Sequence, residues 1–257
     1  MPYPSFHPFT DAPFIELQMV DSTNNYALAR IHAGLAQHGT AIFAHEQVAG
    51  KGQRGKTWAS PKGENIALSI IIKPAPLEVS QQFELSASIA IAAREFFSRY
   101  AGEDTKIKWP NDLYWKDRKA GGILIESIVR SGKPGINTWD WAVIGIGINI
   151  NQANFPPELP NPVSLKQITG KAFDPLELTK ELYAVIDEYY QRLITKGFSA
   201  ILPLYLSHFY KKDEKVKLKK GNRSFEAVIK SVSQDGKLII QHGIEEQFSI
   251  GEIQWII

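Results

Sequence analysis

Apolar positions divide the chain into a long mixed α/β region and a short β-rich region. Helix-spaced apolar residues occupy three segments, at 26–31, 83–97 and 178–193. Short apolar or alternating runs predict six strands, at 40–45, 66–73, 106–109, 113–115, 123–129 and 139–150. We expect Gly145 and Gly147 to break the last of these strands. The pattern predicts an α+β fold in which helices pack on a sheet.

Capping residues mark where the predicted helices begin. The run 21–24 (DSTN) is a cluster of N-cap residues before the first helix, and Ser80 can cap the second. Asp174 caps the third helix, with Pro175 at its first position and Glu177 at its third. The hydroxyl and amide groups at 21–24 are also able to bind a small polar ligand, so both interpretations stay open.

The character of the chain changes near residue 211. Short β-like runs follow, at 215–218, 225–230, 237–240 and 255–257, with hairpin signals between them. Four or five such strands predict a small SH3-like β-barrel, and therefore two domains, 1–211 and 212–257. The lysines of this region are compatible with nucleic acid, but solvated positions that protect an edge strand are the simpler interpretation.

Composition narrows the classes of function. Hydrophobic residues make up 44% of the 257 residues and charged residues 22%, as in ordinary globular proteins. A net charge of +2 is too small to indicate nucleic acid by itself. The absence of cysteine excludes disulfides and thiolate chemistry, and the six histidines show no metal-binding spacing. Without a signal peptide or a membrane-spanning run, we expect a cytoplasmic protein with no membrane partner.

Residues 50–58 (GKGQRGKTW) are the most informative stretch. They match both the dinucleotide fingerprint and the P-loop pattern, and each pattern requires a helix directly after the loop. Pro61 would fall inside that helix at a cost of about 3 kcal/mol, and the run 66–72 is a strand instead. What remains is a strand–loop–strand that binds an anion, or else a basic surface hairpin. Three cations of the loop are available: Lys51, Arg54 and Lys56.

Three further segments could carry chemistry. Residues 108–112 (KWPND) combine a cation, an aromatic ring and a rigid polar turn, and residues 119–124 (KAGGIL) place a lysine before two glycines. Residues 145–149 (GIGIN) put both glycines on one face of a strand. A turn, a β-bulge and a closely packed helix, respectively, are the structural alternatives. Cations with little acid–base machinery favour phosphoryl or nucleotidyl transfer.

Together with the glycine loop, these segments resemble the signatures of the biotin–protein ligases, in the same order and at similar spacing. The resemblance extends from about Gln18 to the C-terminus. It implies a class II synthetase-like catalytic domain, with helices on a mixed β-sheet, and a C-terminal SH3-like domain. It also implies a ligase without an N-terminal DNA-binding domain, which uses ATP with Mg²⁺ to attach biotin to a biotin carboxyl carrier domain. A homodimer is compatible with it.

The resemblance also assigns residues to roles. It implies contacts with biotin by Ser22, Thr23, Asn24, Gln47, Gly50, Arg54, Lys119, Gly121 and Gly122. It implies contacts with ATP by Gly52, Gln53, Arg54, Gly55, Lys56, Trp58, Asn111 and Asn149. The catalytic residues it implies are Lys119, Arg54 and Asp112, with Mg²⁺ carried by ATP near Asp112.

The glycine loop departs from the family pattern. Lys51, Gln53 and Lys56 stand where arginines are common. Lysine keeps the charge but loses the bidentate fork, and glutamine removes a charge, which leaves retention of the adenylate open. A lipoate– or octanoate–protein ligase of the same fold is the nearest alternative, although the KWPND run and the C-terminal module argue against it. A nucleic-acid-binding module is the alternative from another class.

Overall fold

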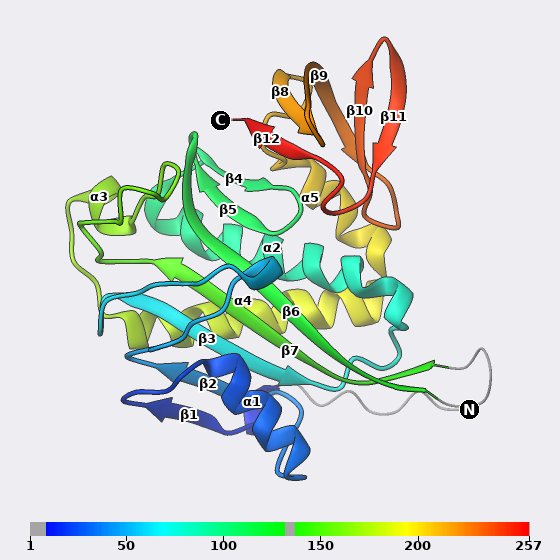
Figure 1. Cartoon of the computed structure of the whole chain (residues 1–257). Helices are drawn as coiled ribbons and strands as arrows, with labels where there is room; N and C mark the ends of the chain where they lie inside the picture. Colours follow the sequence, from blue (N-terminus) through cyan, green and yellow to red (C-terminus); the bar gives the residue numbers. More distant parts are fainter. Residues whose placement is uncertain (1–8, 132–136, 257) are drawn as a thin grey trace.

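A seven-stranded mixed sheet forms the centre of the computed structural model, which describes residues 9–131 and 137–256 (Figure 1). The strand order is β1-β2-β3-β7-β6-β5-β4. Strands β1 and β2 are parallel and the other neighbours are antiparallel. The strands are β1 (Phe14–Leu17), β2 (Ala41–Ala44), β3 (Asn65–Ile72), β4 (Thr105–Lys108), β5 (Asp112–Trp115), β6 (Arg118–Ser131) and β7 (Asn137–Asn149).

Helices cover both faces of this sheet (Figure 1). The helices are α1 (Thr23–His32), α2 (Gln82–Ala101), α3 (Leu165–Thr169), α4 (Pro175–Lys196) and α5 (Leu202–Ser207). Single 3₁₀ turns are η1 (Phe9–Asp11), η2 (Gln53–Gly55), η3 (Val79–Gln81) and η4 (Phe198–Ala200). Side chains on one face of β3, such as Leu68 and Ile70, join the core under α2 and α4, whereas Ile71 packs with Ala27 of α1. Every residue of β3 is therefore buried.

Sequence patterns located most of these elements, with specific errors. The strand at the GIGIN motif is not broken, because β7 pairs continuously with β3 through Gly145 and Gly147. Ser80 does not cap α2, since it lies in η3, where Glu78 and Gln81 form the capping box. Asp174 caps α4 as predicted, accepting from the backbone of Leu176 at 2.8 Å. Patterns missed the short elements β1, α3 and β11.

A second, five-stranded antiparallel sheet forms the C-terminal region. Its strands, in the order β11-β10-β9-β8-β12, are β8 (Lys215–Lys220), β9 (Arg223–Val232), β10 (Leu238–His242), β11 (Ile244–Phe248) and β12 (Gln254–Ile256). This arrangement agrees with the expected SH3-like module, although Ile257 of the last predicted strand lies outside the described residues. The division at residues 211 and 212 stays a prediction.

The C-terminal sheet is fixed to the first region by buried contacts. Trp109 Nε1 donates to the carbonyl oxygen of Gly236 at 2.9 Å. Gly236 has a φ of +81°, and a Cβ there would overlap the ring of Phe83 on α2. Leu218 and Ile229 of the C-terminal sheet belong to the same buried cluster as α2 and α4. Across residues 9–131 and 137–256, no helix is long and apolar enough to cross a membrane.

The tight packing at Gly236 predicts a large effect of a small substitution. We expect Gly236→Ala to lower the free energy of unfolding by about 3 kcal/mol, because it combines left-handed strain with overpacking against Phe83. Gly221→Ala is the matched control: its φ is +57° but nothing lies near its Cβ, so about 1 kcal/mol is expected. Urea unfolding measures both, and equal losses would contradict the packing argument.

Candidate active site

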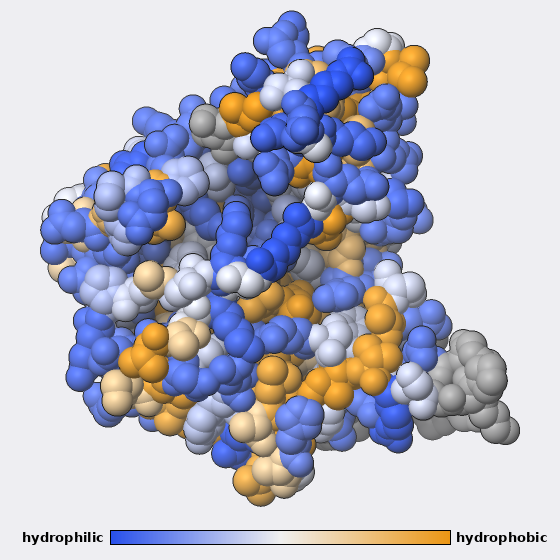
Figure 2. All heavy atoms as spheres, in the orientation of Figure 1, coloured by the Kyte–Doolittle hydropathy of each residue, from blue (hydrophilic) through white to orange (hydrophobic). Residues whose placement is uncertain are grey.

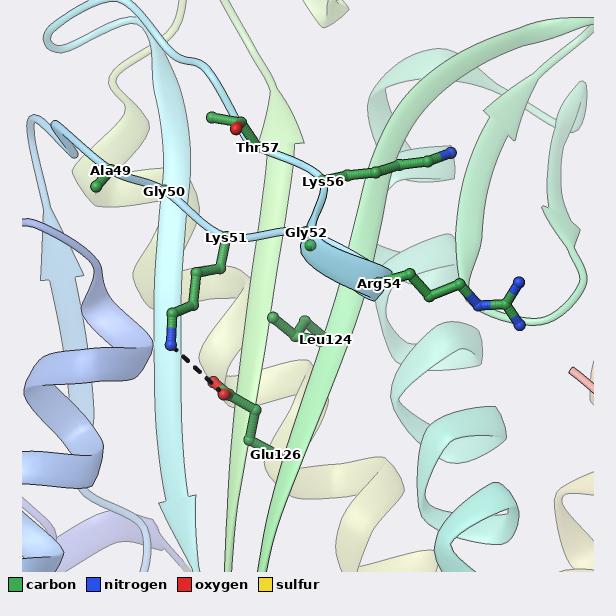
Figure 3. Close-up of a pocket in the computed structure, with 10 residues that line it drawn as sticks. Ala49, Gly50, Lys51, Gly52, Arg54, Lys56, Thr57, Leu124 and Glu126 are labelled. Carbon is green, nitrogen blue, oxygen red and sulfur yellow. Dashed lines mark ion pairs between the residues drawn. The ribbon is translucent and has the colours of Figure 1, made fainter. Parts of the chain in front are cut away.

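The glycine loop lies over β6 and encloses a cavity of about 450 Å³ (Figure 3). Its lining residues are Ala49, Gly50, Lys51, Gly52, Arg54, Gly55, Lys56, Thr57, Leu124 and Glu126. Hydrophilic side chains gather over the middle of this face of the molecule, next to an apolar area over β6 and β7 (Figure 2). Leu124 of the lining pairs with Gly145, whose Cβ position lies against Asn24 of α1. The cavity is therefore on the face of the sheet that α1 covers, opposite α2 and α4.

The loop is a closed hairpin between β2 and β3, as the sequence predicted. Its backbone is joined by hydrogen bonds from Gly52 N to the Lys56 oxygen at 2.6 Å and from Trp58 N to the Gly50 oxygen at 2.8 Å. At its tip Arg54 has φ 57° and ψ 43°, a left-handed conformation that is uncommon for a residue with a side chain. A Cβ on Gly50 would overlap the Trp58 carbonyl, so glycine is required there for the hairpin to close.

The loop cations point in two directions. Lys51 Nζ lies 3.6 Å from a carboxylate oxygen of Glu126 on β6, in a half-exposed ion pair. Arg54 and Lys56 extend the other way, across β6 and away from Lys51 (Figure 3). The structure thus separates the three cations that the sequence grouped around one anion, and it leaves Arg54 and Lys56 at one end of the cavity.

A network of polar side chains lies beside the loop, at the start of α1. The Gln47 side-chain oxygen accepts from Thr23 N at 2.8 Å and from Thr23 Oγ1 at 3.0 Å. Ser69 Oγ lies 2.7 Å from Thr23 Oγ1 and 2.6 Å from Asn24 Oδ1. Asn24 Nδ2 donates to Glu126 Oε2 at 2.7 Å. Three predicted site residues are therefore brought together in a preorganised set of donors and acceptors.

Glycines on β7 make room for this network. A Cβ on Gly145 would overlap the side-chain amide of Asn24, and one on Gly147 would overlap the indole of Trp58. Both glycines face the same side of the strand, as the alternation predicted. The close packing of a helix, which was the structural alternative, holds for Gly145, while Gly147 receives a ring from the glycine loop. Ser22, the N-cap residue of α1, is buried beside them.

The KWPND and KAGGIL segments meet where Asp112 of β5 pairs with Gly122 of β6. Lys119 Nζ forms a half-buried ion pair with Asp112 Oδ1 at 2.6 Å. Gly122 faces this pair, since its Cβ position lies 3.3 Å from Asp112 Oδ1. Gly121 faces the backbone of β7 instead, and the register shift beside it leaves Ala120 without a partner in β5. The β-bulge, which was the structural alternative for this segment, is therefore present at Ala120, and only Gly122 faces the Lys119–Asp112 pair.

Two predicted ATP-contacting asparagines are used to hold the backbone. The Asn111 amide donates to the carbonyl oxygen of Ile123, which fixes the turn of the KWPND segment to β6. The Asn149 amide donates to the Val163 carbonyl oxygen at 3.1 Å. Both side chains are buried, at 7% and 5% exposure. In this arrangement the two asparagine side chains hold the ends of neighbouring strands in position through backbone hydrogen bonds.

Sequence reasoning missed two polar members of the site. The sequence could have indicated Glu126, because side chains alternate along a strand and Glu126 therefore lies on the same face of β6 as Leu124 and Gly122. Ser69 gave no such signal, since it lies inside an otherwise apolar strand whose pairing and packing depend on distant residues. Both belong to the network that surrounds Asn24.

Residues 16–149 match the model of the Biotin/lipoate A/B protein ligase family, and the chain belongs to this family. It is 30% identical over 220 residues to the "Bifunctional ligase/repressor BirA" of Bacillus spizizenii, covering 83% of this chain and 66% of that protein. It is 31% identical over 235 residues to the "Biotin--[acetyl-CoA-carboxylase] ligase" of Paracoccus denitrificans, covering 88% of this chain and 92% of that protein.

A solved structure resembles the whole chain. The "Biotin protein ligase from Aquifex aeolicus in complex with biotin and ATP" superposes with a TM-score of 0.77 at 26% identity. The similarity covers 95% of this chain and 99% of that one. Because it includes both sheets, the similarity extends to the C-terminal region that the family match does not reach.

The network around Asn24 gives a test of the site's structure. We expect Asn24→Ala to lower the free energy of unfolding by about 2–3 kcal/mol, because the buried Ser69 and the partly buried Glu126 lose partners. Asn25→Ala, on the same helix, removes an exposed bond to Asp21 and should cost about 0.5 kcal/mol. Chemical denaturation compares the two, and similar losses would show that the network contributes little.

Proposed function

We propose that this chain is an ATP-dependent biotin–protein ligase. It forms biotinyl-5′-AMP and pyrophosphate from biotin and MgATP, and then transfers biotin to a lysine of a biotin carboxyl carrier domain. The observation that carries the proposal is a cavity under the glycine loop that adjoins the polar network of Asn24 through Glu126 and is lined at its other end by the cations Arg54 and Lys56. Biotin has a neutral ureido ring at one end and a carboxylate at the other. The similarity to the Aquifex protein, solved with biotin and ATP, supports this assignment.

The first reaction joins the two substrates across the cation end. A carboxylate oxygen of biotin attacks the α-phosphorus of ATP, the bond to the α,β-bridging oxygen breaks, and pyrophosphate leaves with the electron pair. Negative charge develops on the phosphate oxygens, and fixed cations lower the barrier to this transfer. Lys119 is the central cation, because Asp112 holds its ammonium group in place. Arg54 and Lys56 extend from the loop across β6, away from Lys51, and would add further positive charge (Figure 3).

The second reaction uses the adenylate as an activated acyl group. The amine of the carrier lysine attacks the carbonyl carbon, the bond from that carbon to the phosphate oxygen breaks, and AMP leaves. Water would hydrolyse the same mixed anhydride, so the intermediate has to be shielded. The closed hairpin of the glycine loop lies where it can provide this cover.

The polar network is the proposed ureido site. Thr23, Asn24 and Gln47 would exchange some of their present hydrogen bonds for bonds to the ring. Ser22 and the loop backbone at Gly50 would also contact the ring. Gly122 and Leu124 would line the path of the valeryl chain, with Gly121 behind them. The loop residues Gly52, Gln53 and Gly55, together with Trp58, would face the nucleotide. Asn111 and Asn149 would support its site through the backbone segments they hold.

Mg²⁺ enters this proposal as part of the substrate MgATP. Within residues 9–131 and 137–256, no group of three histidine, cysteine, aspartate or glutamate side chains could hold a metal ion. Asp112 offers one carboxylate at the cation end, and its Oδ1 is bound to Lys119. A resident metal does not fit these residues, whereas an ion carried by the phosphates requires no more than one such contact.

The lysines of the C-terminal sheet do not extend the proposal to nucleic acid. Several are neutralised by carboxylates, in the pairs Lys211–Glu214, Lys215–Glu226, Lys230–Asp213 and Lys237–Asp235. Alternating charges of this kind favour the interpretation of a solvated surface over a continuous basic stripe.

The central role of Lys119 can be tested directly. We expect Lys119→Ala to slow biotin-dependent pyrophosphate release at least about 100-fold, because the cation nearest the developing charge is lost. The fold should persist, since this lysine is half-exposed. Lys106→Ala, on β4, serves as the control and should retain normal release. Normal release by the Lys119 variant would remove Lys119 from its assigned role.

The substrate can be distinguished within the family. Lipoate carries an apolar dithiolane where biotin carries a ureido group, and it would leave the buried donors and acceptors around Asn24 without partners. We expect pyrophosphate release and carrier labelling with biotin, and at least about 100-fold lower kcat/KM with lipoate. A response to lipoate but not to biotin would identify the chain as a lipoate ligase instead.

A further inference from the structure

Lys108, the first residue of the KWPND segment, is an ammonium group without a carboxylate partner in the described part of the chain. Its cross-strand neighbour is Asp112, but that carboxylate is bound to Lys119 at 2.6 Å. Lys108 Nζ instead donates to Tyr114 Oη at 3.2 Å. Burial is the main reason that its pKa falls to about 8, which shows that the surroundings stabilise this charge poorly.

Two aromatic rings from different sheets hold this ammonium group. The Tyr114 ring on β5 lies 4.8 Å from Lys108 Nζ, and the Trp255 ring on β12 lies 5.4 Å from it. Tyr210 packs against both rings, with centroid distances of 5.0 and 5.8 Å. Ring faces attract a cation and fix its position, but they do not neutralise it. The lysine is therefore held in place and remains able to bind an anion.

The position of Lys108 relates it to the cavity. One register row crosses the sheet from Gly147 to Gly122, then to Asp112, and ends at Lys108. The charges that act on Lys108 are those of Asp112, Lys119 and Lys56. Lys108 is thus close enough to interact with two other ammonium groups but with only one carboxylate. Such an excess of positive charge suits a polyphosphate and repels the ammonium form of an incoming lysine.

We propose that Lys108 binds the β- and γ-phosphates of ATP and the pyrophosphate that leaves, and that Trp255 positions its ammonium group. This inference rests on the proposed function and adds a catalytic residue to it. As the α,β-bridging bond breaks, the electron pair moves onto the pyrophosphate oxygens, and Lys108 neutralises part of that charge. We assign it no contact with the α-phosphate, so it would serve the first reaction and not the second.

Measuring the two reactions separately distinguishes this catalytic role of Lys108 from a structural role. The variants are Lys108→Met, which keeps the length of the side chain without its charge, and the control Lys106→Met, two residues earlier on β4. Biotin-dependent pyrophosphate release from MgATP measures the first reaction. Transfer from synthetic biotinyl-5′-AMP to a carrier domain measures the second, in which no β- or γ-phosphate takes part.

We expect Lys108→Met to lower kcat/KM for MgATP about 10–100-fold, the effect of losing a charge-assisted hydrogen bond. Transfer from biotinyl-5′-AMP should stay within about twofold of wild type, which also shows that the variant folds. Lys108→Arg should recover most of the first reaction. Trp255→Leu should raise KM for MgATP with little change in kcat, and Trp255→Phe should restore it.

Equal losses in both reactions, a loss in the second reaction alone, or an unchanged first reaction would each overturn the assignment of Lys108. These outcomes are distinct from a failure of the proposed function. In that case the wild-type chain itself would release no pyrophosphate in response to biotin.

Discussion

The close approach of α1 and the glycine loop to β7 is the constraint on which the site depends. Asn24 and Trp58 occupy the space that side chains on Gly145 and Gly147 would fill. Neither glycine has a positive φ, so the strand requires them for clearance and not for backbone conformation. Adding one methyl group at either position would push the helix or the ring off the sheet. The polar network and the loop hairpin both depend on this contact.

The space that the glycines of β7 leave also relates to the different chemistry of the two ends of the cavity. The register row that passes under Trp58 begins with Ala67 and Gly147, continues through Gly122, and ends at Asp112 and Lys108. Small residues occupy the middle of this row, and the charges of Asp112 and Lys108 lie at its far end. The polar network around Asn24 lies on the other side of the cavity, where Glu126 is paired with Lys51. A ligand that is neutral and polar at one end and anionic at the other matches this gradient without leaving a buried charge unpaired.

Local sequence chemistry predicted much of this arrangement, because several decisive signals are local. Pro61 excluded a helix after the glycine loop, and Asp174 located the start of α4 correctly. The error at β7 has a physical cause: glycine weakens an isolated strand, but pairing with β3 and β6 on both sides overrides that weakness. Ser69 and Glu126 could not be assigned to the site in advance, since their role depends on strand order and on where α1 lies.

Contacts between the two sheets were likewise beyond sequence reasoning, and they concentrate at the cation end of the cavity. Trp255 lies against Lys108, and a Cβ on Gly251 would overlap the guanidinium group of Arg54. Cations brought together without enough carboxylates repel one another, so those without an ionic partner have to be held by other contacts. Asp112 pairs with Lys119, while the rings of Tyr114 and Trp255 hold Lys108. The C-terminal module therefore helps to hold in place cations whose charge is not neutralised by carboxylates and which can bind an anion.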